Sequence, residues 1–295
     1  MTELLDTRAA DAAYQSFPSF QEWQRNVVVD VAKWDRFTEK LTLIKDGATP
    51  QLLEKAKEVV KRATAWDTGS LEGLYDTNIG VTMTIALENS LWENMLSEKG
   101  EDAIALFAAQ LHAYSYVLDF ATQAVHIIPT WIRQLHAELC APQKTYKALT
   151  PQGYQNLTLP KGEYKALPNH VIGRDDKPHY YAPVDITPTE VDRLCNEMQT
   201  ATFLNAHPVL QASYVHYAFV LIHPFADGNG RVARALASVF TYRALSVPLL
   251  ILLESRSQYL SALMQADAGN YQPFVDFVME RAFDSIRVFE ESVLS

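Results

Sequence analysis

The chain has 295 residues, 48% of them hydrophobic, and a formal net charge of −10 at pH 7. This length and composition allow a substantial buried core, whereas the acidic balance argues against general binding to nucleic acid. The first residues show neither the basic nor the apolar region of a signal peptide, and the longest late apolar run, VPLLILL, is too short to span a bilayer. We therefore expect a cytoplasmic protein that contacts no membrane.

Apolar residues recur at helical spacing through most of the chain. Thr49 and Pro50, for example, fit an N-cap followed by proline at the first helical position. The predicted helices cover residues 19–44, 50–65, 80–97, 100–124, 129–140, 187–202, 208–222, 230–245, 255–266 and 272–293.

Residues 157–173, LTLPKGEYKALPNHVIG, interrupt this pattern with turn residues and short β-prone pieces. They predict a small hairpin or an extended flap. No repeat or glycine-serine linker divides the chain. We expect an all-α fold with a small β-hairpin, consisting of a core over residues 81–295 and an N-terminal helical extension over residues 1–80.

The stretch HPFADGNGRVAR, residues 223–234, lies between two apolar helical runs. The proline after His223 disfavours helix, so His223 is expected where the first run ends. Gly228, Asn229 and Gly230 lie at the start of the next helix, whose unpaired N–H groups form an anion site. The glycines allow a phosphate to approach closely, and Asn229 adds an amide donor.

Charged side chains complete this stretch. Arg231 and Arg234 are three residues apart on one helical face, so both guanidinium groups could reach the outer phosphates of one nucleotide. Asp227 places a carboxylate among these cations, as expected if it holds a Mg²⁺ ion that bridges phosphate oxygens. His223, neutral near pH 7, is suited to remove a proton from an incoming hydroxyl.

The stretch resembles the signature of the Fic family, H-P-F-x-[D/E]-G-N-G-R-x-x-R, and matches it at every specified position. The resemblance implies a helical core in which a flap hairpin holds a target segment beside ATP. The target hydroxyl then attacks the α-phosphorus and gives an AMP-protein and pyrophosphate. The implied roles are general base for His223, Mg²⁺ ligand for Asp227, phosphate cradle for Gly228 to Gly230, α-phosphate contact for Asn229, and β- and γ-phosphate contacts for Arg231 and Arg234.

The resemblance extends over about residues 65–290. GEYKALPNHVIG is similar to the family's flap, and RSQYLSAL is similar to the region that closes over the adenine side. The flap residues implied for target docking are Tyr164, Lys165, Val171, Ile172 and Gly173, with Lys165 standing where an arginine is frequent. The intact G-N-G favours transfer of AMP over the phosphate or phosphocholine transfer of related proteins.

A second stretch, DTGSLEGLYD at residues 67–76, resembles the inhibitory motif [S/T]-x-x-x-E-[G/N] of one class of Fic proteins. This resemblance assigns the motif to Thr68, Glu72 and Gly73. A Glu72 carboxylate held against Arg234 would pair with the guanidinium meant for the γ-phosphate and would repel that phosphate. We therefore expect the protein alone to transfer little AMP.

Three functions remain open at this point. The leading one is a protein adenylyltransferase that uses Mg-ATP to modify a Ser, Thr or Tyr hydroxyl and is restrained by Glu72. A second is removal of AMP by the same site, with Glu72 positioning a water. A third is a nucleotide-sensing interaction module, which the intact base and arginines argue against. The modified protein is unidentified, self-modification is one option, and a homo-oligomer stays open.

Overall fold

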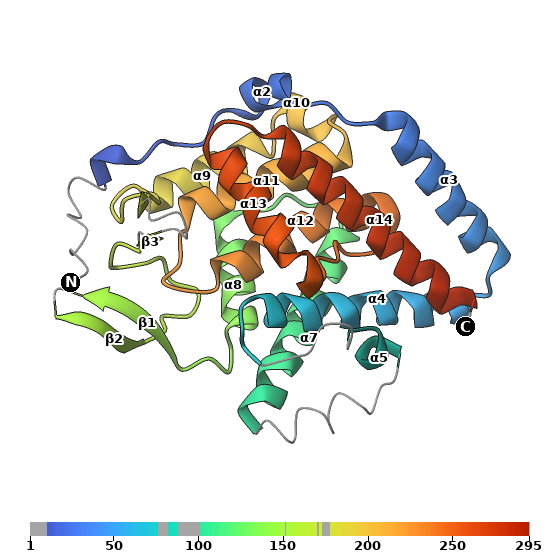
Figure 1. The fold of residues 1–295 in the computed structure, drawn as a ribbon, viewed down its shortest axis with the longest axis horizontal. Coiled ribbons are helices and arrows are strands. Elements are labelled where there is room, and N and C mark those ends of the chain that lie inside the picture. Colours follow the sequence, from blue (N-terminus) through green and yellow to red (C-terminus); the bar gives the residue numbers. More distant parts are fainter. Residues whose placement is uncertain are drawn as a thin grey trace.

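The fold is that of a computed structural model, which describes residues 11–75, 82–87, 101–150, 152–169, 171–172 and 178–294. Two helices form its centre, α11 (Pro208–Ile222) and α12 (Asn229–Leu245). Helices α4 (Pro50–Leu71), α7 (Glu101–Ala121) and α14 (Gln272–Leu294) pack around them (Figure 1). The expectation of an all-α fold with a small β part is confirmed.

The other elements complete this helical body. They are α2 (Phe20–Trp23), η1 (Gln24–Asn26), α3 (Val31–Gly47), α5 (Thr82–Leu87), α8 (Pro129–Leu139), α9 (Thr187–Glu197), α10 (Ala201–Leu204), η2 (Leu253–Ser255) and α13 (Arg256–Asp267). Among the described residues, no helix combines the length and the apolar character needed to cross a bilayer.

Helix α11 is apolar on every side, and ten of its residues are buried. A helix of this kind belongs in a core, because it has no face to offer to water. Its first residue is Pro208, preceded by the N-cap His207, whose Nδ1 accepts a hydrogen bond from the Val209 N–H at 3.2 Å. Burial of α11 and α12 places the loop between them, residues 223–228, against the body of the protein.

Two predicted helices are each divided in two by a capping residue. The predicted helix 19–44 stops after η1, and α3 begins behind Asp30, whose Oδ1 accepts from the Lys33 N–H at 2.9 Å. The predicted helix 187–202 stops at α9, and Thr200 caps α10 through the Phe203 N–H at 3.3 Å. Asp and Thr side chains favour such caps over helix interiors.

Strands β1 (Thr145–Thr150) and β2 (Gly153–Thr158) form an antiparallel hairpin, which projects at the lower left of Figure 1. Its turn residue Gly153 has φ 95°, a conformation that favours glycine. A second antiparallel pair joins β3 (Val171–Ile172) to β4 (Pro178–His179).

The predicted position of the hairpin, 157–173, was therefore only partly right. The longer hairpin overlaps this stretch only at residues 157–158, and of the second pair only β3 falls inside it. Residues 159–169 form no strand, and the Lys165 N–H donates to the Pro224 carbonyl at 2.8 Å instead of to a neighbouring strand. Of the predicted helix 80–97 only residues 82–87 are described, and Gly173 lies outside the described residues, as does the predicted boundary near residue 80.

Candidate active site

The loop between α11 and α12 has an unusual backbone at both ends. His223 is the C-cap of α11 and adopts φ 51° and ψ 58°, a left-handed conformation that is uncommon outside glycine and asparagine. Gly228 is the N-cap of α12 and adopts φ 80°. The helix predicted from residue 230 begins at Asn229, so its first N–H groups face the loop, as an anion site requires.

Asn229 closes this loop with its side chain. Its Oδ1 accepts from the Phe225 N–H at 2.9 Å, and its Nδ2 donates to the Phe225 carbonyl at 2.8 Å. The residue is only 2% exposed. In this structure the amide predicted to contact the α-phosphate therefore fixes the loop through Phe225.

The two glycines stand where other side chains come close. A Cβ atom added to Gly228 would lie 2.7 Å from the Cys140 Sγ. A Cβ atom added to Gly230 would collide with the Glu72 carboxylate and would lie 3.0 Å from Nη1 of Arg234. The absence of a side chain at residue 230 lets the Glu72 carboxylate rest on the first turn of α12.

Arg234 binds the end of α4 through three hydrogen bonds. Its Nη2 donates to the Glu72 carboxylate at 2.6 Å and to the Thr68 carbonyl at 3.1 Å, and its Nε donates to the Thr68 hydroxyl at 2.7 Å. The Arg234 side chain is 3% exposed and that of Glu72 is 27% exposed. Burial acts to raise the pKa of Glu72, but the charges of Arg234 and Arg231 outweigh it and hold the pKa below its usual range.

Gly73 determines how Glu72 is presented. Helix α4 ends with Glu72 as C-cap, and Gly73 follows with φ 67°. The Gly73 N–H donates to the Ser70 carbonyl at 3.0 Å, and the Leu74 N–H donates to the Gly69 carbonyl at 3.1 Å. This pair of hydrogen bonds is the Schellman motif. Thr68 and Glu72 of the predicted inhibitory motif thus both bind Arg234, and Gly73 ends the helix that carries them.

Asp227 and Arg231 are joined by Gln143. The Gln143 Nε2 donates to the Asp227 carboxylate at 2.6 Å, and its Oε1 accepts from Nη2 of Arg231 at 2.7 Å. Arg231 is 1% exposed, and its buried Nε has no hydrogen-bond partner among the described residues. A buried, unsatisfied donor beside the start of α12 fits an anion as ligand.

His136, from α8, contacts two residues of the same loop, Phe225 and Asp227. Its Nε2 lies 3.0 Å from the Asp227 carbonyl, its Nδ1 accepts from the Gly162 N–H at 2.9 Å, and its ring stacks on Phe225 at 3.9 Å. Burial, with Arg231 nearby, lowers the pKa of His136 to about 4. The ring is therefore neutral near pH 7, with Nδ1 as acceptor and Nε2 as donor.

The His223 side chain is half-buried. Its Nδ1 lies 3.2 Å from the Val220 carbonyl, and the ring of Tyr181 stacks on it with centroids 3.8 Å apart. His223 lines a cavity of about 200 Å³ together with Glu72, Gly230 and Arg234. The other lining residues are Leu71, Val220, Arg256, Tyr259, Leu260 and Leu263. The predicted base and brake thus share one cavity, with apolar side chains from α13 on one wall.

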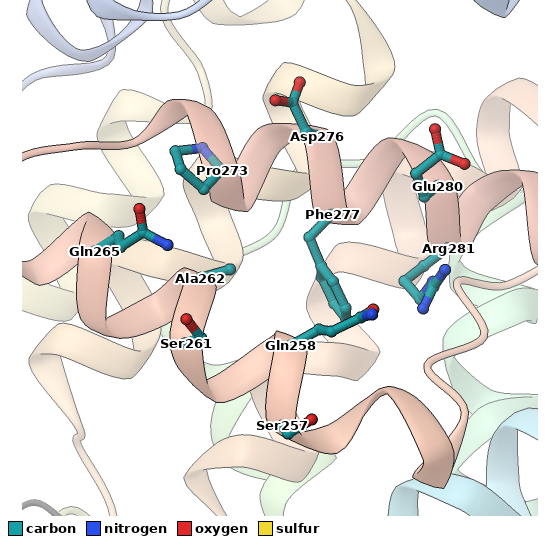
Figure 2. A pocket seen from close by; sticks show the side chains of 10 residues that line it. All are labelled: Ser257, Gln258, Ser261, Ala262, Gln265, Pro273, Asp276, Phe277, Glu280 and Arg281. Atoms are coloured by element: carbon teal, nitrogen blue, oxygen red, sulfur yellow. The ribbon is translucent and has the colours of Figure 1, made fainter.

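A larger groove of about 500 Å³ lies on the opposite face of α13 (Figure 2). Ser257, Gln258 and Ser261 line it from α13, and Arg281 lines it from α14. These α13 positions alternate with those that face the His223 cavity, as helical geometry requires. Its described lining residues include no histidine and no cysteine. Its lining includes none of residues 223–234, so the groove lies apart from the chemistry that the loop supports.

The predicted flap residues lie partly against the loop. The Tyr164 ring is 5.8 Å from that of Phe225, and the guanidinium of Arg133 lies over it at 5.6 Å. Lys165 is 3% exposed and contacts the loop. Val171 and Ile172 form β3, and Gly173 is outside the described residues.

The surroundings of Asp227 fit a Mg²⁺ ion that is bound together with phosphates. Its carboxylate already accepts from Gln143 and from the Gly228 N–H at 2.7 Å, and each oxygen has a further lone pair. The described residues contain no group of three or more His, Cys, Asp or Glu side chains placed to hold a metal. Mg²⁺ commonly uses one or two carboxylates and completes its shell with waters and substrate phosphates, which agrees with a single Asp227.

Sequence reasoning missed four residues that hold the loop: His136, Gln143, Asn169 and Tyr181. They come from α8, from the segment before β1 and from the segments around β3 and β4. His136, Gln143 and Tyr181 belong to no motif, and Asn169 lies in the stretch similar to the flap but was not singled out there. Only contacts across the fold bring these residues to the site.

A family model, described as the Fic/DOC family, matches residues 126–241. Protein adenylyltransferase fic-1 of Caenorhabditis elegans is 38% identical over 84 residues, which are 28% of this chain and 16% of that protein. Protein adenylyltransferase Fic of Nematostella vectensis is 43% identical over 82 residues, 27% of this chain and 19% of that protein. The matched part thus spans less than one fifth of the length of these curated relatives.

Solved structures with a similar fold cover most of the chain. A Fic domain containing signaling protein from Bacteroides thetaiotaomicron has a TM-score of 0.72 and 21% identity, covering 88% of this chain and 96% of that one. Fic-1 from C. elegans, residues 134–508, has a TM-score of 0.63 and 18% identity, covering 88% and 72%. At these identities the likeness concerns the fold.

Proposed function

We propose that this chain, whose residues 126–241 form a domain of the Fic/DOC family, is a protein adenylyltransferase that Glu72 holds inactive. It would transfer AMP from Mg-ATP to a Ser, Thr or Tyr hydroxyl of a target protein, or of the chain itself. The observation that carries this proposal is the shared cavity of His223, Gly230, Arg234 and Glu72. It combines a proton acceptor, a helix N-terminus and a cation, which transfer of AMP needs.

The base, the N–H donors and the charged side chains of residues 223–234 each have a role in this reaction. The oxygen of the target hydroxyl forms a bond to the α-phosphorus, and pyrophosphate leaves. His223 takes the proton of that hydroxyl. The N–H groups at the start of α12 stabilise the negative charge on the α-phosphate. Arg231 and Arg234 bind the outer phosphates, which orients the leaving group in line with the attack. A Mg²⁺ ion held by Asp227 would neutralise phosphate charge.

Glu72 acts as the brake because it competes with ATP for Arg234. Its carboxylate forms a charge-assisted hydrogen bond of 2.6 Å with the guanidinium and rests above Gly230. A phosphate in the same place would meet a like charge and would lose its cation. ATP then binds without the orientation that transfer requires.

Removal of AMP is a second candidate function. It is favoured by the position of the Glu72 carboxylate, which lines the same cavity as the His223 imidazole. A carboxylate there could orient a water for attack on the α-phosphorus of an AMP-protein. The two reactions respond to Glu72→Gly in opposite directions, because transfer should rise and removal should stop.

The test is intact-mass analysis after incubation with Mg-ATP, using the wild type, Glu72→Gly and Glu72→Gly/His223→Ala. We expect an AMP-sized adduct on Glu72→Gly alone. An adduct of equal yield on the variant that lacks His223 would contradict the assigned base. If no variant gains mass, the same three proteins incubated with an AMP-modified hydroxyl peptide test the removal reaction.

A further inference from the structure

His223 is held in a backbone conformation that costs free energy. A left-handed residue other than glycine is disfavoured because its Cβ comes too close to the following carbonyl oxygen. Among the described residues only His223 and Ser246 combine a positive φ with a side chain. Such a conformation persists when its surroundings fix it, and it turns the imidazole out of the register of α11. The contacts that fix it therefore determine where the imidazole points.

Four consecutive carbonyls around His223 accept hydrogen bonds from one short segment of the chain. The Lys165 Nζ donates to Ile222 at 3.4 Å and the Lys165 N–H donates to Pro224 at 2.8 Å. The Asn169 Nδ2 donates to the carbonyl of His223 at 3.2 Å and to that of Phe225 at 2.9 Å. We call Lys165 and Asn169 the carbonyl clasp.

The two clasp residues are also joined to each other. The Lys165 Nζ donates to the Asn169 Oδ1 at 2.8 Å, which fixes the amide so that its Nδ2 faces the loop. Lys165 is 3% exposed, and burial lowers its pKa to about 7. Burying an ammonium group is costly, so a lysine in this place needs a compensating set of acceptors. Ile222 and Asn169 supply it.

We propose that Lys165 and Asn169 are positioning residues for His223, which hold its left-handed backbone so that the imidazole faces the cavity shared with Arg234. This inference rests on the proposed role of His223 as base. In this proposal the Lys165 side chain binds the backbone next to His223. The flap resemblance had implied that it docks a target. The clasp contacts neither nucleotide nor target in this assignment, and it acts on the rate of the chemical step.

The experiment uses the chain with Glu72→Gly, which relieves the brake. Asn169→Asp keeps the size of the side chain and the acceptor for Lys165 but removes the donor to the His223 and Phe225 carbonyls. Lys165→Met removes the ammonium, whereas Lys165→Arg keeps donors. Lys161→Met is the matched control, because Lys161 is an exposed lysine four residues away that donates to the Ala141 carbonyl.

We expect Asn169→Asp and Lys165→Met to lower kcat about 10- to 100-fold, the loss typical of a base displaced by about 1 Å. KM for ATP should change less than about twofold, because the phosphate contacts are untouched. Lys165→Arg should recover most of the rate and Lys161→Met should match the parent. Equal losses in kcat and in ATP affinity, with no recovery in Lys165→Arg, would overturn the proposal in favour of a purely structural role.

A second readout does not depend on activity. The ¹H–¹³C imidazole signal of His223, assigned by its disappearance in His223→Ala, should shift in Asn169→Asp and Lys165→Met and stay in place in Lys161→Met. Unchanged signals in both clasp variants would overturn the proposal whatever their activity. If the parent transfers no AMP, the proposed function fails, and the imidazole signal still decides whether the clasp positions His223.

Discussion

Residues 223–234, which are the loop and the start of α12, meet the end of α4 at Arg234, yet the two regions are held in different ways. In the loop, backbone carbonyls and side chains are bonded from several directions, by Asn229, Gln143 and Asn169. The Glu72 carboxylate has one hydrogen-bonded partner among the described residues, Arg234, and its side chain is 27% exposed. The loop is thus fixed by many contacts, whereas the Glu72 carboxylate is fixed by one.

This contrast separates two kinds of residue in one cavity. Loss of a loop residue should lower activity, because the geometry that it maintains serves the reaction itself. Loss of the brake should raise activity, because Arg234 and the start of α12 stay in place without Glu72. Substitutions in the loop should therefore lower the rate of AMP transfer, and substitutions of Glu72 should raise it.

The largest effect is expected for His223→Ala in the Glu72→Gly background. A positioned general base contributes about 10²- to 10⁴-fold, so transfer of AMP should fall by that factor while ATP still binds. Rates of AMP incorporation and calorimetric titration with Mg-ATP measure the two quantities. His112→Ala is the control, since this histidine side chain is 70% exposed. Retention of the parent's rate would place His223 outside the chemistry.

Gly230→Ala tests whether the start of α12 is an open phosphate surface. The added methyl group would lie 3.0 Å from Nη1 of Arg234 and would occupy the place of the Glu72 carboxylate. In the Glu72→Gly background we expect transfer to fall about 10- to 100-fold because the phosphates are displaced. Gly47→Ala, where nothing lies within 4 Å, is the matched control. A rate equal to that of the parent would show that no phosphate approaches Gly230.

Asp67→Asn tests a buried carboxyl group in α4, the helix that carries Glu72. Burial raises the pKa of Asp67 to about 7, while its Oδ1 accepts from Thr82 at 3.0 Å and from the Leu253 N–H at 3.3 Å. Because the folded pKa lies above the unfolded one, the protonated form stabilises the fold at low pH, and that stability is lost as pH rises through about 7.

Asn is neutral and keeps the acceptor at this position. Asp67→Asn should therefore remove roughly 2–4 kcal/mol of the pH dependence of the unfolding free energy between about pH 4 and 7. Urea unfolding at pH 5 and pH 8 measures it. An unchanged difference between the two pH values would mean that Asp67 titrates normally.

The smallest effect is expected for Thr68→Val. It removes the hydroxyl that accepts from Nε of Arg234 at 2.7 Å but leaves the Glu72 pair in place. A single hydrogen bond contributes about 1 kcal/mol, so the brake should weaken about fivefold and basal transfer should rise by a similar factor. Thr68→Ser should behave as the wild type. A fall in basal transfer would mean that Thr68 supports the catalytic position of Arg234 instead.

The sequence could predict the loop because its parts are neighbours in the chain. Pro224 and Gly228 fix the ends of two helices by local backbone rules, and Arg231 and Arg234 share one helical face. The pairing of Glu72 with Arg234 joins residues far apart, and it was accessible only through the resemblance of its short motif.

Other parts of the site could not be predicted, for physical reasons. His136 and Gln143 are ordinary residues of an amphipathic helix and of a loop, and they become important only because the fold brings them to Asp227 and Arg231. The role of Lys165 in docking a target stays a prediction, and the sequence did not indicate that its side chain is buried and donates to the Ile222 carbonyl. The hairpin was placed too late in the chain because Lys165 and Asn169 bond to the loop and not to a strand.

The most direct test of the brake is the initial rate of pyrophosphate release from Mg-ATP by the wild type, Glu72→Gln and Glu72→Gly. A charge-assisted hydrogen bond contributes about 1.5–3 kcal/mol, so Glu72→Gly should release pyrophosphate about 10- to 100-fold faster than the wild type. Glu72→Gln, which keeps the shape and loses the charge, should lie between them. Equal rates in all three folded proteins would contradict the claim that the Glu72 carboxylate and the ATP phosphates compete for Arg234.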